Sequence, residues 1–244
     1  MTHNLLLFSN SRSAGQPFLG HALPALRGFL EGVERLFFAP YASHDYASYL
    51  GLVREALAPL GVEVAGLDRE ADPQAALETA QALFVGGGNS FRLVAALHKL
   101  ELLEVVRRRV AAGELRYIGA SAGTNVACPT IRTTNDMPVV EPPSLRAFGL
   151  LPFQINPHYL DADPHSTHMG ETREMRLLEF LDENDVAVVG LREGAWLRRQ
   201  DEQLTLEGEN GARLFRRGHE AEDLAGGADL SFLLHAPAEF DKPV

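Results

Sequence analysis

The sequence predicts an α/β fold in which a mostly parallel sheet carries helices on both faces and gains antiparallel strands from the C-terminal part of the chain. Three observations support this fold class. Short apolar runs alternate with longer amphipathic stretches, glycine-rich turns follow two of the apolar runs, and no linker divides the 244 residues. Repeated strand, loop and helix units imply right-handed crossovers and hence parallel strands. We expect a single α/β domain that spans residues 1–244.

The alternation is clearest in the N-terminal half. Strands are predicted at residues 5–9, 35–40, 62–67, 82–85 and 116–118, and helices at residues 18–32, 46–60, 71–80, 90–100 and 103–112. Asp72 suits the N-cap of its helix and Pro73 the first helical position, because the cap accepts free N–H groups and proline lacks one. Gly61 and Gly113 follow two predicted helix ends, where glycine is common.

The alternation breaks after residue 118. Residues 129–143 and 157–170 are long polar segments, and loops of this length in a compact domain are more often functional than idle. A helix is predicted at 172–184, a strand at 186–191 and a β-hairpin at 195–207. Residues 213–234 are expected to complete the sheet with antiparallel pieces.

Composition excludes several classes of function. The chain has 22 Lys and Arg against 33 Asp and Glu, a net charge of −11, so we expect neither a nucleic acid nor an anionic membrane as a partner. No apolar stretch reaches the ~18 residues of a membrane span. The N-terminus lacks the basic region of a signal peptide, and the single cysteine, Cys128, cannot form an internal disulfide. These features predict a soluble cytoplasmic protein.

Residues 119–123 match the pattern G-x-S-x-G between a predicted strand and a segment compatible with a helix. This context is that of a nucleophile elbow, in which Ser121 would project from the carboxyl end of the sheet. The N–H group of Ala122 at the helix start would then face a developing oxyanion. The alternative is a glycine-rich turn in which the serine caps the helix.

A second glycine loop occupies residues 86–89, again between a strand and a helix. It is not a dinucleotide fingerprint, because Phe91 stands where that motif needs glycine, and the lysine of a P-loop is absent. Its unobstructed N–H groups allow Gly87 or Gly88 to supply a second oxyanion donor. A tight turn used only for packing is the alternative.

A serine nucleophile needs a base, and an imidazole oriented by a carboxylate serves near neutral pH. His158 follows an apolar stretch, where a strand end can deliver it to the active edge. Asp136 and Glu193 are the two candidates for the carboxylate. Glu193 follows a predicted strand, whereas Asp136 would restore the chain order of α/β-hydrolases. The residues alone leave this choice open.

Two other chemistries have weaker support. His165 and His168, with Asp161 and Asp163, could bind a metal, but this spacing without a helical frame or cysteines is nonspecific. Cys128 lacks a surrounding elbow and is expected to be a small buried residue. No feature requires a metal or a cofactor.

Five blocks together resemble the peptidase E family of α-aspartyl dipeptidases. They are residues 7–11, 85–91, 119–138, 154–158 and 170–174, and they occur in family order between residue 7 and about residue 196. The resemblance implies a flavodoxin-like fold related to class I glutamine amidotransferases, with serine in place of their cysteine. It also implies cleavage of Asp-X dipeptides that have a free N-terminus.

Carried onto this sequence, the resemblance makes Ser121 the nucleophile and His158 the base. Of the oxyanion donors considered above, we expect Gly88 and Ala122 to serve. For the third member the family has been described both with a Glu, matching Glu193, and with an Asp, matching Asp136. Strand-end placement favours Glu193 as the orienting carboxylate, which leaves Asp136 to position substrate.

Aspartate specificity requires a cation, and a guanidinium meets a carboxylate with bidentate geometry. Arg132 in the long loop is the leading candidate for this role. Asn89 and Arg173 are further candidates for substrate binding, although Arg173 could instead simply begin a helix. Residues 157–170 would form a lid that excludes longer peptides.

The expected partner is a small peptide, and the chain is expected to be a monomer or a homodimer. A cyanophycinase-like β-aspartyl peptidase and a non-catalytic flavodoxin-like module that binds an anion are the alternative functions.

Overall fold

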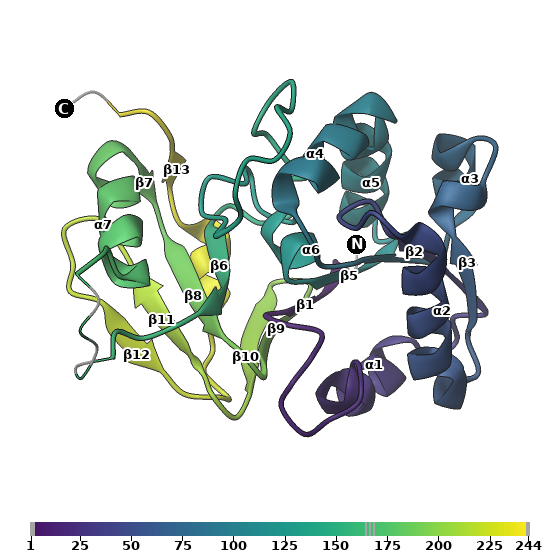
Figure 1. The fold of residues 1–244 in the computed structure, drawn as a ribbon, viewed down its shortest axis with the longest axis horizontal. Coiled ribbons are helices and arrows are strands. Elements are labelled where there is room, and N and C mark those ends of the chain that lie inside the picture. Colours follow the sequence, from purple (N-terminus) through teal and green to yellow (C-terminus); the bar gives the residue numbers. More distant parts are fainter. Residues whose placement is uncertain (1–2, 164, 166, 168, 243–244) are drawn as a thin grey trace.

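The computed structural model describes residues 3–163, 165, 167 and 169–242 (Figure 1). Its strands are β1 (Asn4–Phe8), β2 (Arg35–Ala39), β3 (Glu63–Gly66), β4 (Ala82–Val85), β5 (Arg116–Ala120), β6 (Gln154–Tyr159), β7 (Asp185–Val186), β8 (Val188–Arg192), β9 (Ala195–Gln200), β10 (Gln203–Gly208), β11 (Ala212–Phe215), β12 (Glu222–Leu224) and β13 (Ala238–Glu239). Its α-helices are α1 (Leu23–Phe29), α2 (Tyr46–Leu57), α3 (Pro73–Thr79), α4 (Ser90–Lys99), α5 (Leu102–Ala111), α6 (Ala122–Asn125) and α7 (Arg173–Glu183). Short 3-10 helices are η1 (Gly20–Ala22), η2 (Ala58–Leu60), η3 (Leu67–Arg69) and η4 (Ser231–His235).

A seven-stranded sheet in the order β10-β9-β1-β5-β4-β2-β3 forms the centre of the molecule. The five neighbouring strands β1, β5, β4, β2 and β3 are parallel. The hairpin of β9 and β10 adds two antiparallel strands beside β1. The register pairs Phe8 with Ala120 and Val85 with Gly119. The carboxyl ends of β1, β4 and β5 therefore meet at one edge, which confirms the predicted α/β class.

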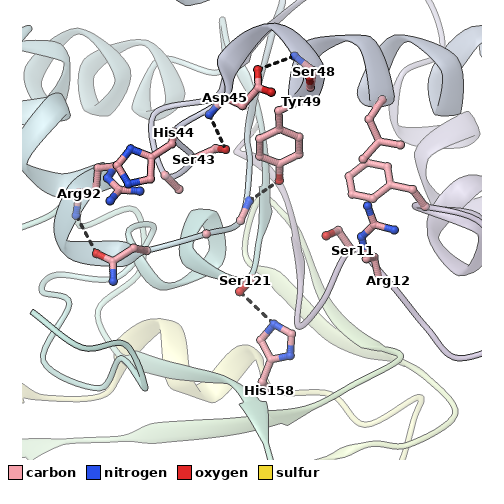
Figure 2. A pocket seen from close by; sticks show the side chains of 16 residues that line it. Ser11, Arg12, Ser43, His44, Asp45, Ser48, Tyr49, Arg92, Ser121 and His158 are labelled. Atoms are coloured by element: carbon pink, nitrogen blue, oxygen red, sulfur yellow. Dashed lines mark hydrogen bonds between the residues drawn. The ribbon is translucent and has the colours of Figure 1, made fainter. Parts of the chain in front are cut away.

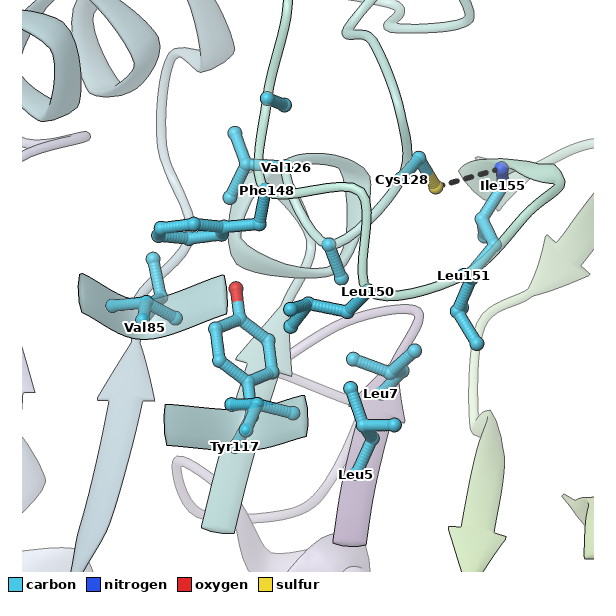
Figure 3. Close-up of a cluster of buried hydrophobic side chains, with 14 of the residues drawn as sticks. Leu5, Leu7, Val85, Tyr117, Val126, Cys128, Phe148, Leu150, Leu151 and Ile155 are labelled. Carbon is cyan, nitrogen blue, oxygen red and sulfur yellow. Dashed lines mark hydrogen bonds between the residues drawn. The ribbon is translucent and has the colours of Figure 1, made fainter. Parts of the chain in front are cut away.

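Successive residues of a parallel strand point to opposite faces of the sheet. They form two hydrophobic layers, one on each face, against which the apolar sides of the helices pack. Leu6 and Phe8 face the layer that contains the apolar residues of α1 and α2. Leu5 and Leu7 face the layer that contains those of α3, α4 and α5. Figure 3 shows the second layer, where the fully buried Tyr117 packs beside Phe148 below the loop that follows α6. The sheet is thus covered on both faces, as predicted.

The C-terminal part differs from the expectation that it completes the same sheet. The hairpin at 195–207 does join the large sheet, but β6, β8, β11 and β12 form a second sheet in the order β12-β11-β8-β6. The helix α7 covers this sheet, and Leu177 and Leu181 pack against Tyr159, Val188 and Phe215. Because β6 lies next to β8 and not next to β1, β6, β8, β11 and β12 build a separate layer beside the first (Figure 1).

Two element boundaries also differ from prediction. The predicted helix at 18–32 reduces to η1 and a short α1, because Leu19 has a left-handed backbone and Pro24 must lie in a first turn. The strand predicted to end at residue 118 continues as β5 to Ala120. This extension is important, because it brings Ser121 directly to the end of a buried strand. None of the described helices is long and apolar enough to cross a membrane.

Candidate active site

Ser121 lies in the sharp turn between β5 and α6. Its φ of 53° and ψ of −111° are unusual for a residue with a side chain. The turn can form because a Cβ at Gly119 would lie 2.6 Å from the Gly123 carbonyl oxygen, and one at Gly123 would lie 2.0 Å from that of Val85. The two glycines of the motif therefore permit close backbone contacts that hold the strained serine in place.

Ser121, His158 and Glu193 form a continuous hydrogen-bonded chain. His158 Nδ1–H donates to Glu193 Oε1 across 2.6 Å. On the other side of the ring, Nε2 accepts from Ser121 Oγ at 3.0 Å, a contact shown in Figure 2. His158 follows Pro157 at an irregularity in β6 and has a φ of 52°. Glu193 follows the last residue of β8. The two strand ends that the sequence analysis singled out thus bring an imidazole and a carboxylate into one hydrogen-bonded chain with the serine.

The carboxyl end of β1 contacts all three of these segments. The Phe8 carbonyl oxygen accepts a hydrogen bond from Ser121 N at 3.1 Å. The buried Ser9 hydroxyl accepts from His158 N at 2.9 Å and donates to the Leu191 carbonyl oxygen in β8 at 2.8 Å. These bonds fix the backbone of the base relative to both the nucleophile and the strand that leads to Glu193.

Asn10 extends this arrangement by one residue. Its fully buried side chain accepts from Gly194 N at 2.8 Å and donates to the Arg12 carbonyl oxygen at 2.6 Å. On the opposite side of the turn, Asn210 donates to the Glu193 carbonyl oxygen at 2.6 Å. The peptide unit between Glu193 and Gly194 is therefore held at both its carbonyl and its N–H group.

The second glycine loop lies against the serine. A Cβ at Gly87 would come within 3.0 Å of the Ser121 Cβ. The N–H of Gly87 is occupied, since it donates to the Tyr49 hydroxyl at 2.8 Å, and burial raises the pKa of Tyr49 to about 12, which keeps that hydroxyl neutral. No group in the described part of the chain accepts the N–H of Gly88 or of Ala122. Gly88 has a φ of 135°, and a Cβ there would lie 2.4 Å from the Ala42 carbonyl oxygen, so this position requires glycine.

Asp136 and Asn89 support the glycine loop. Asp136 accepts from Ser90 N at 2.7 Å and from the Thr134 hydroxyl at 3.2 Å. Asn89 caps α4 by accepting from Arg92 N, and its amide group donates to the Met137 carbonyl oxygen. In this geometry Glu193, and not Asp136, is bonded to His158.

Two cavities meet at His158. The larger, of about 770 Å³, is lined by Ser121, Gly87 and Gly88, by the apolar Phe18, Tyr49 and Leu52, and by the basic Arg12, His44 and Arg92. The smaller, of about 510 Å³, lies on the Glu193 side and is lined by Arg173, Tyr159 and Arg192. The imidazole of His158 is thus accessible from two sides, and Ser121 is accessible from the larger cavity.

The structure does not bring Arg132 to these cavities. Its guanidinium is bound by both carboxylate oxygens of Asp241, at 2.6 and 3.0 Å, and it lines a different cavity beside Phe240. Arg173 begins α7, as the alternative predicted, yet its side chain also lines the cavity at His158. Partial burial and the neighbouring Arg176 lower the pKa of Arg173, while Asp136 raises it. No described carboxylate forms an ion pair with Arg173 within 4.0 Å.

The predicted lid at 157–170 begins with residues of β6. Its next part is anchored, because Asp161 forms a bidentate ion pair with Arg192 at 2.7 and 2.9 Å. His168, named above as a possible metal ligand, lies outside the described residues. Within the described residues no group of three or more His, Cys, Asp and Glu side chains is placed to hold a metal ion.

Cys128 is fully buried, as expected, and its sulfur accepts from Ile155 N at 3.2 Å (Figure 3). Burial raises the pKa of its thiol to about 12, so the thiolate is not formed near neutral pH.

Sequence reasoning assigned no role to Ser9, Asn10 or Arg192. Ser9 and Asn10 belong to the block at 7–11 that carried the family resemblance, and two consecutive polar residues directly after an apolar strand were the available signal. Their partners are 149 and 184 positions away along the chain, so no local pattern could identify those contacts. Arg192 was adjacent to a proposed catalytic carboxylate but carried no motif.

Several known proteins are similar to this chain. Residues 5–207 match the model of Peptidase family S51. The chain is 58% identical over 238 residues to peptidase E of Streptomyces coelicolor, covering 98% of each protein. It is 48% identical over 233 residues to a probable alpha-aspartyl dipeptidase of Drosophila melanogaster, covering 95% of this chain and 97% of that protein.

Two solved structures share the fold. A putative peptidase E from Listeria monocytogenes EGD-e has a TM-score of 0.65 at 22% identity, covering 85% of this chain and 99% of that one. A peptidase from an acI-B1 Actinobacterium has a TM-score of 0.66 at 19% identity, covering 95% and 98%. At these identities the likeness concerns the fold alone, and it confirms the predicted architecture.

The choice between the two carboxylates can be tested by the reactivity of Ser121. Glu193→Gln should slow covalent labelling of Ser121 by a fluorophosphonate about 10²- to 10⁴-fold, because the imidazolium loses its counter-charge and its orienting acceptor. Asp136→Asn keeps an oxygen that can accept from Ser90 N and should change the labelling rate much less. If the labelling rate fell equally in the two variants, the assignment of Glu193 as the orienting carboxylate would be wrong.

Ser9 provides a test of positioning. Ser9→Ala leaves His158 N and the Leu191 carbonyl without their partner and should slow labelling of Ser121 at least about 10-fold, because a misplaced base costs rate steeply. Ser9→Cys, which retains a weak donor and acceptor, should recover part of the rate. Ser144→Ala, which removes a hydroxyl that accepts from Arg146 N in a distant turn, is the control. A lower melting temperature with an unchanged labelling rate in Ser9→Ala would show that Ser9 is only structural.

Proposed function

The chain belongs to peptidase family S51, and from this premise we propose that it is a serine dipeptidase that hydrolyses Asp-X dipeptides with a free N-terminal aspartate. The observation that carries the proposal is the hydrogen-bonded chain from Glu193 through His158 to Ser121. The names of the relatives in Streptomyces coelicolor and Drosophila melanogaster support the peptidase and the aspartyl specificity.

Acylation begins when Ser121 Oγ attacks the carbonyl carbon of the Asp-X bond and His158 Nε2 takes the hydroxyl proton. The negative charge of the tetrahedral intermediate develops on the carbonyl oxygen, which accepts from the N–H groups of Gly88 and Ala122. Both groups lack a partner among the described residues, and both belong to turns that contact Ser121. Glu193 stabilises the imidazolium that forms.

The intermediate collapses when His158 donates its proton to the leaving amine, so that the amino acid X departs and an aspartyl ester of Ser121 remains. His158 then deprotonates a water molecule that attacks the ester, and proton return to Ser121 Oγ regenerates the enzyme. The half-exposed side chains of His158 and Glu193 leave the ester accessible to water.

Arg173 is better placed than Arg132 to bind the aspartate side chain. Arg173 lines the cavity that reaches His158 and has no ion-pair partner among the described carboxylates, whereas Arg132 is already neutralised by Asp241. A guanidinium without a carboxylate partner is available for bidentate binding of a substrate carboxylate. Asn89 and Asp136 then contribute to substrate binding indirectly, because they maintain the shape of the glycine loop at residues 86–89.

The remaining expectations concern partners and location. A small peptide is the proposed partner, and neither a nucleic acid nor a membrane is required by the chemistry of the site. We propose a cytoplasmic location, because the buried Cys128 is a free thiol and the fold does not depend on oxidation. A monomer or a homodimer is the proposed assembly.

Hydrolysis of four peptides tests the function directly. The wild-type protein should cleave Asp-Leu, but not Glu-Leu, Ala-Leu or N-acetyl-Asp-Leu, and Ser121→Ala should abolish cleavage, as measured by release of free leucine. Fluorophosphonate labelling of the wild-type protein but not of Ser121→Ala would verify that the serine reacts. Absence of cleavage together with absence of labelling would favour the non-catalytic binding module instead.

Specificity for aspartate is tested by two arginine variants. Arg173→Ala should lower the ratio of kcat/KM for Asp-Leu over Ala-Leu about 10- to 100-fold, because it removes a charge-assisted pair that only aspartate can make. Arg132→Ala should leave that ratio unchanged. If Arg132→Ala, and not Arg173→Ala, collapses the ratio, the sequence-based assignment of Arg132 is correct after all.

A further inference from the structure

Eleven of the 20 arginines in this acidic chain form no ion pair with a described carboxylate, and three of these eleven lie beside Ser121 and His158. Nine arginines form ion pairs with carboxylates: Arg35, Arg107, Arg108, Arg109, Arg132, Arg176, Arg192, Arg213 and Arg216. Arg12, Arg92 and Arg173 have no such partner among the described carboxylates, and all three line the two cavities that meet at His158. In a chain with a net charge of −11, guanidinium groups without partners beside a reactive serine point to an anionic ligand.

An Asp-X dipeptide presents two carboxylates, one on each side of the bond to be cleaved. If Arg173 binds the aspartate side chain in the smaller cavity, the α-carboxylate of X requires a cation in the larger one. That cavity contains one described acidic residue, Asp45, whose carboxylate already caps α2 by accepting from Ser48 N. The larger cavity thus has room and free positive charge for the leaving residue.

We propose that Arg12 binds the α-carboxylate of the leaving residue X and that this contact makes the enzyme select dipeptides. The proposal rests on the function proposed above and assigns a further specificity residue to the same site. The apolar Phe18, Tyr49 and Leu52 in the same cavity would accommodate the side chain of X. A residue X whose carboxylate is blocked by an amide or by a further peptide bond would lose the ion pair.

The position of the general acid favours Arg12 over Arg92. His158 Nε2 protonates the leaving amine, so X must lie over the imidazole and away from the oxyanion donors Gly88 and Ala122. Arg12 comes three residues after Ser9, which binds His158 N. Arg92 follows the glycine loop on α4, and Figure 2 shows it across that loop from Ser11 and Arg12.

The backbone that carries Arg12 is fixed although its side chain is exposed. Asn10 Nδ2 donates to the Arg12 carbonyl oxygen at 2.6 Å and to the Ser13 hydroxyl at 3.1 Å. The Arg12 guanidinium lies over the Phe18 ring, 5.4 Å from its centroid. The same Asn10 side chain binds Gly194 beside Glu193, so the cation and the orienting carboxylate share one buried anchor. Such preorganisation reduces the entropy that is lost when the carboxylate binds.

Two substrates that differ only in this carboxylate test the proposal. With Asp-Leu and Asp-Leu-amide, the wild-type protein should prefer Asp-Leu, and Arg12→Ala should lower kcat/KM for Asp-Leu about 10- to 100-fold while kcat/KM for the amide stays within about twofold. The amide thus controls for folding and for the catalytic residues. Arg12→Lys, which keeps the charge without the bidentate geometry, should recover part of the loss.

Arg92→Ala is the matched control, because Arg92 lines the opposite wall of the same cavity. It should leave the ratio of the two rates unchanged. The assignment of Arg12 would be overturned if Arg12→Ala left the ratio of kcat/KM for Asp-Leu over Asp-Leu-amide unchanged, as it would if both values fell equally. It would also be overturned if Arg92→Ala lowered that ratio strongly. If the wild-type protein cleaves neither substrate, the proposed function itself fails. If it cleaves Asp-Leu and Arg12→Ala does not alter the preference for Asp-Leu over the amide, only the assignment of Arg12 fails.

Discussion

The carboxyl end of β1 is the constraint on which the active site depends. The three members of the hydrogen-bonded chain come from residues 121, 158 and 193, and they follow strands of two different sheets. Three consecutive residues bind all three segments: Phe8 accepts from Ser121 N, Ser9 from His158 N, and Asn10 from Gly194 N. Since Ser9 and Asn10 are fully buried, their side chains cannot exchange these bonds for bonds to water. The large sheet therefore sets the distances that proton transfer requires.

This anchoring explains how two strained residues persist at the site. Ser121 and His158 both have positive φ angles near 50°, and such conformations typically cost on the order of 1–3 kcal/mol each. Close backbone contacts at Gly119 and Gly123 leave the chain no room to relax at the serine. At the histidine, the preceding peptide unit is held at both ends, because its N–H donates to Ser9 and its Pro157 carbonyl oxygen accepts from Asn135. The strain points both side chains out of the sheet edge and toward each other.

The local parts of this site could be predicted and the distant contacts could not. Ser121 lies in a five-residue pattern between a strand and a helix, and His158 and Glu193 follow apolar strands, so short-range patterns identified all three. Strand-end placement already favoured Glu193 over Asp136, but the contact of Glu193 with His158 depends on β6 lying beside β8 in a second sheet, which no local pattern encodes. Arg132 was assigned to substrate from its residue type and its place in the long loop, but it pairs with Asp241, 109 positions away. The second sheet was missed for the same reason, because strand pairing is a long-range property.

The negative net charge of the chain makes the arginines near Ser121 important for binding an anionic substrate. A net charge of −11 creates a mean field that repels a dipeptide with two carboxylates and one ammonium group, so attraction must come from charges close to the serine. An arginine neutralised by Asp or Glu, as Arg132 and Arg192 are, contributes little to such attraction. Arg12, Arg92 and Arg173 lie on both sides of His158 and form no ion pair with a described carboxylate, although the nearby Asp136 raises the pKa of Arg173. Positive charge that no ion pair offsets therefore lies where a doubly carboxylated substrate would bind.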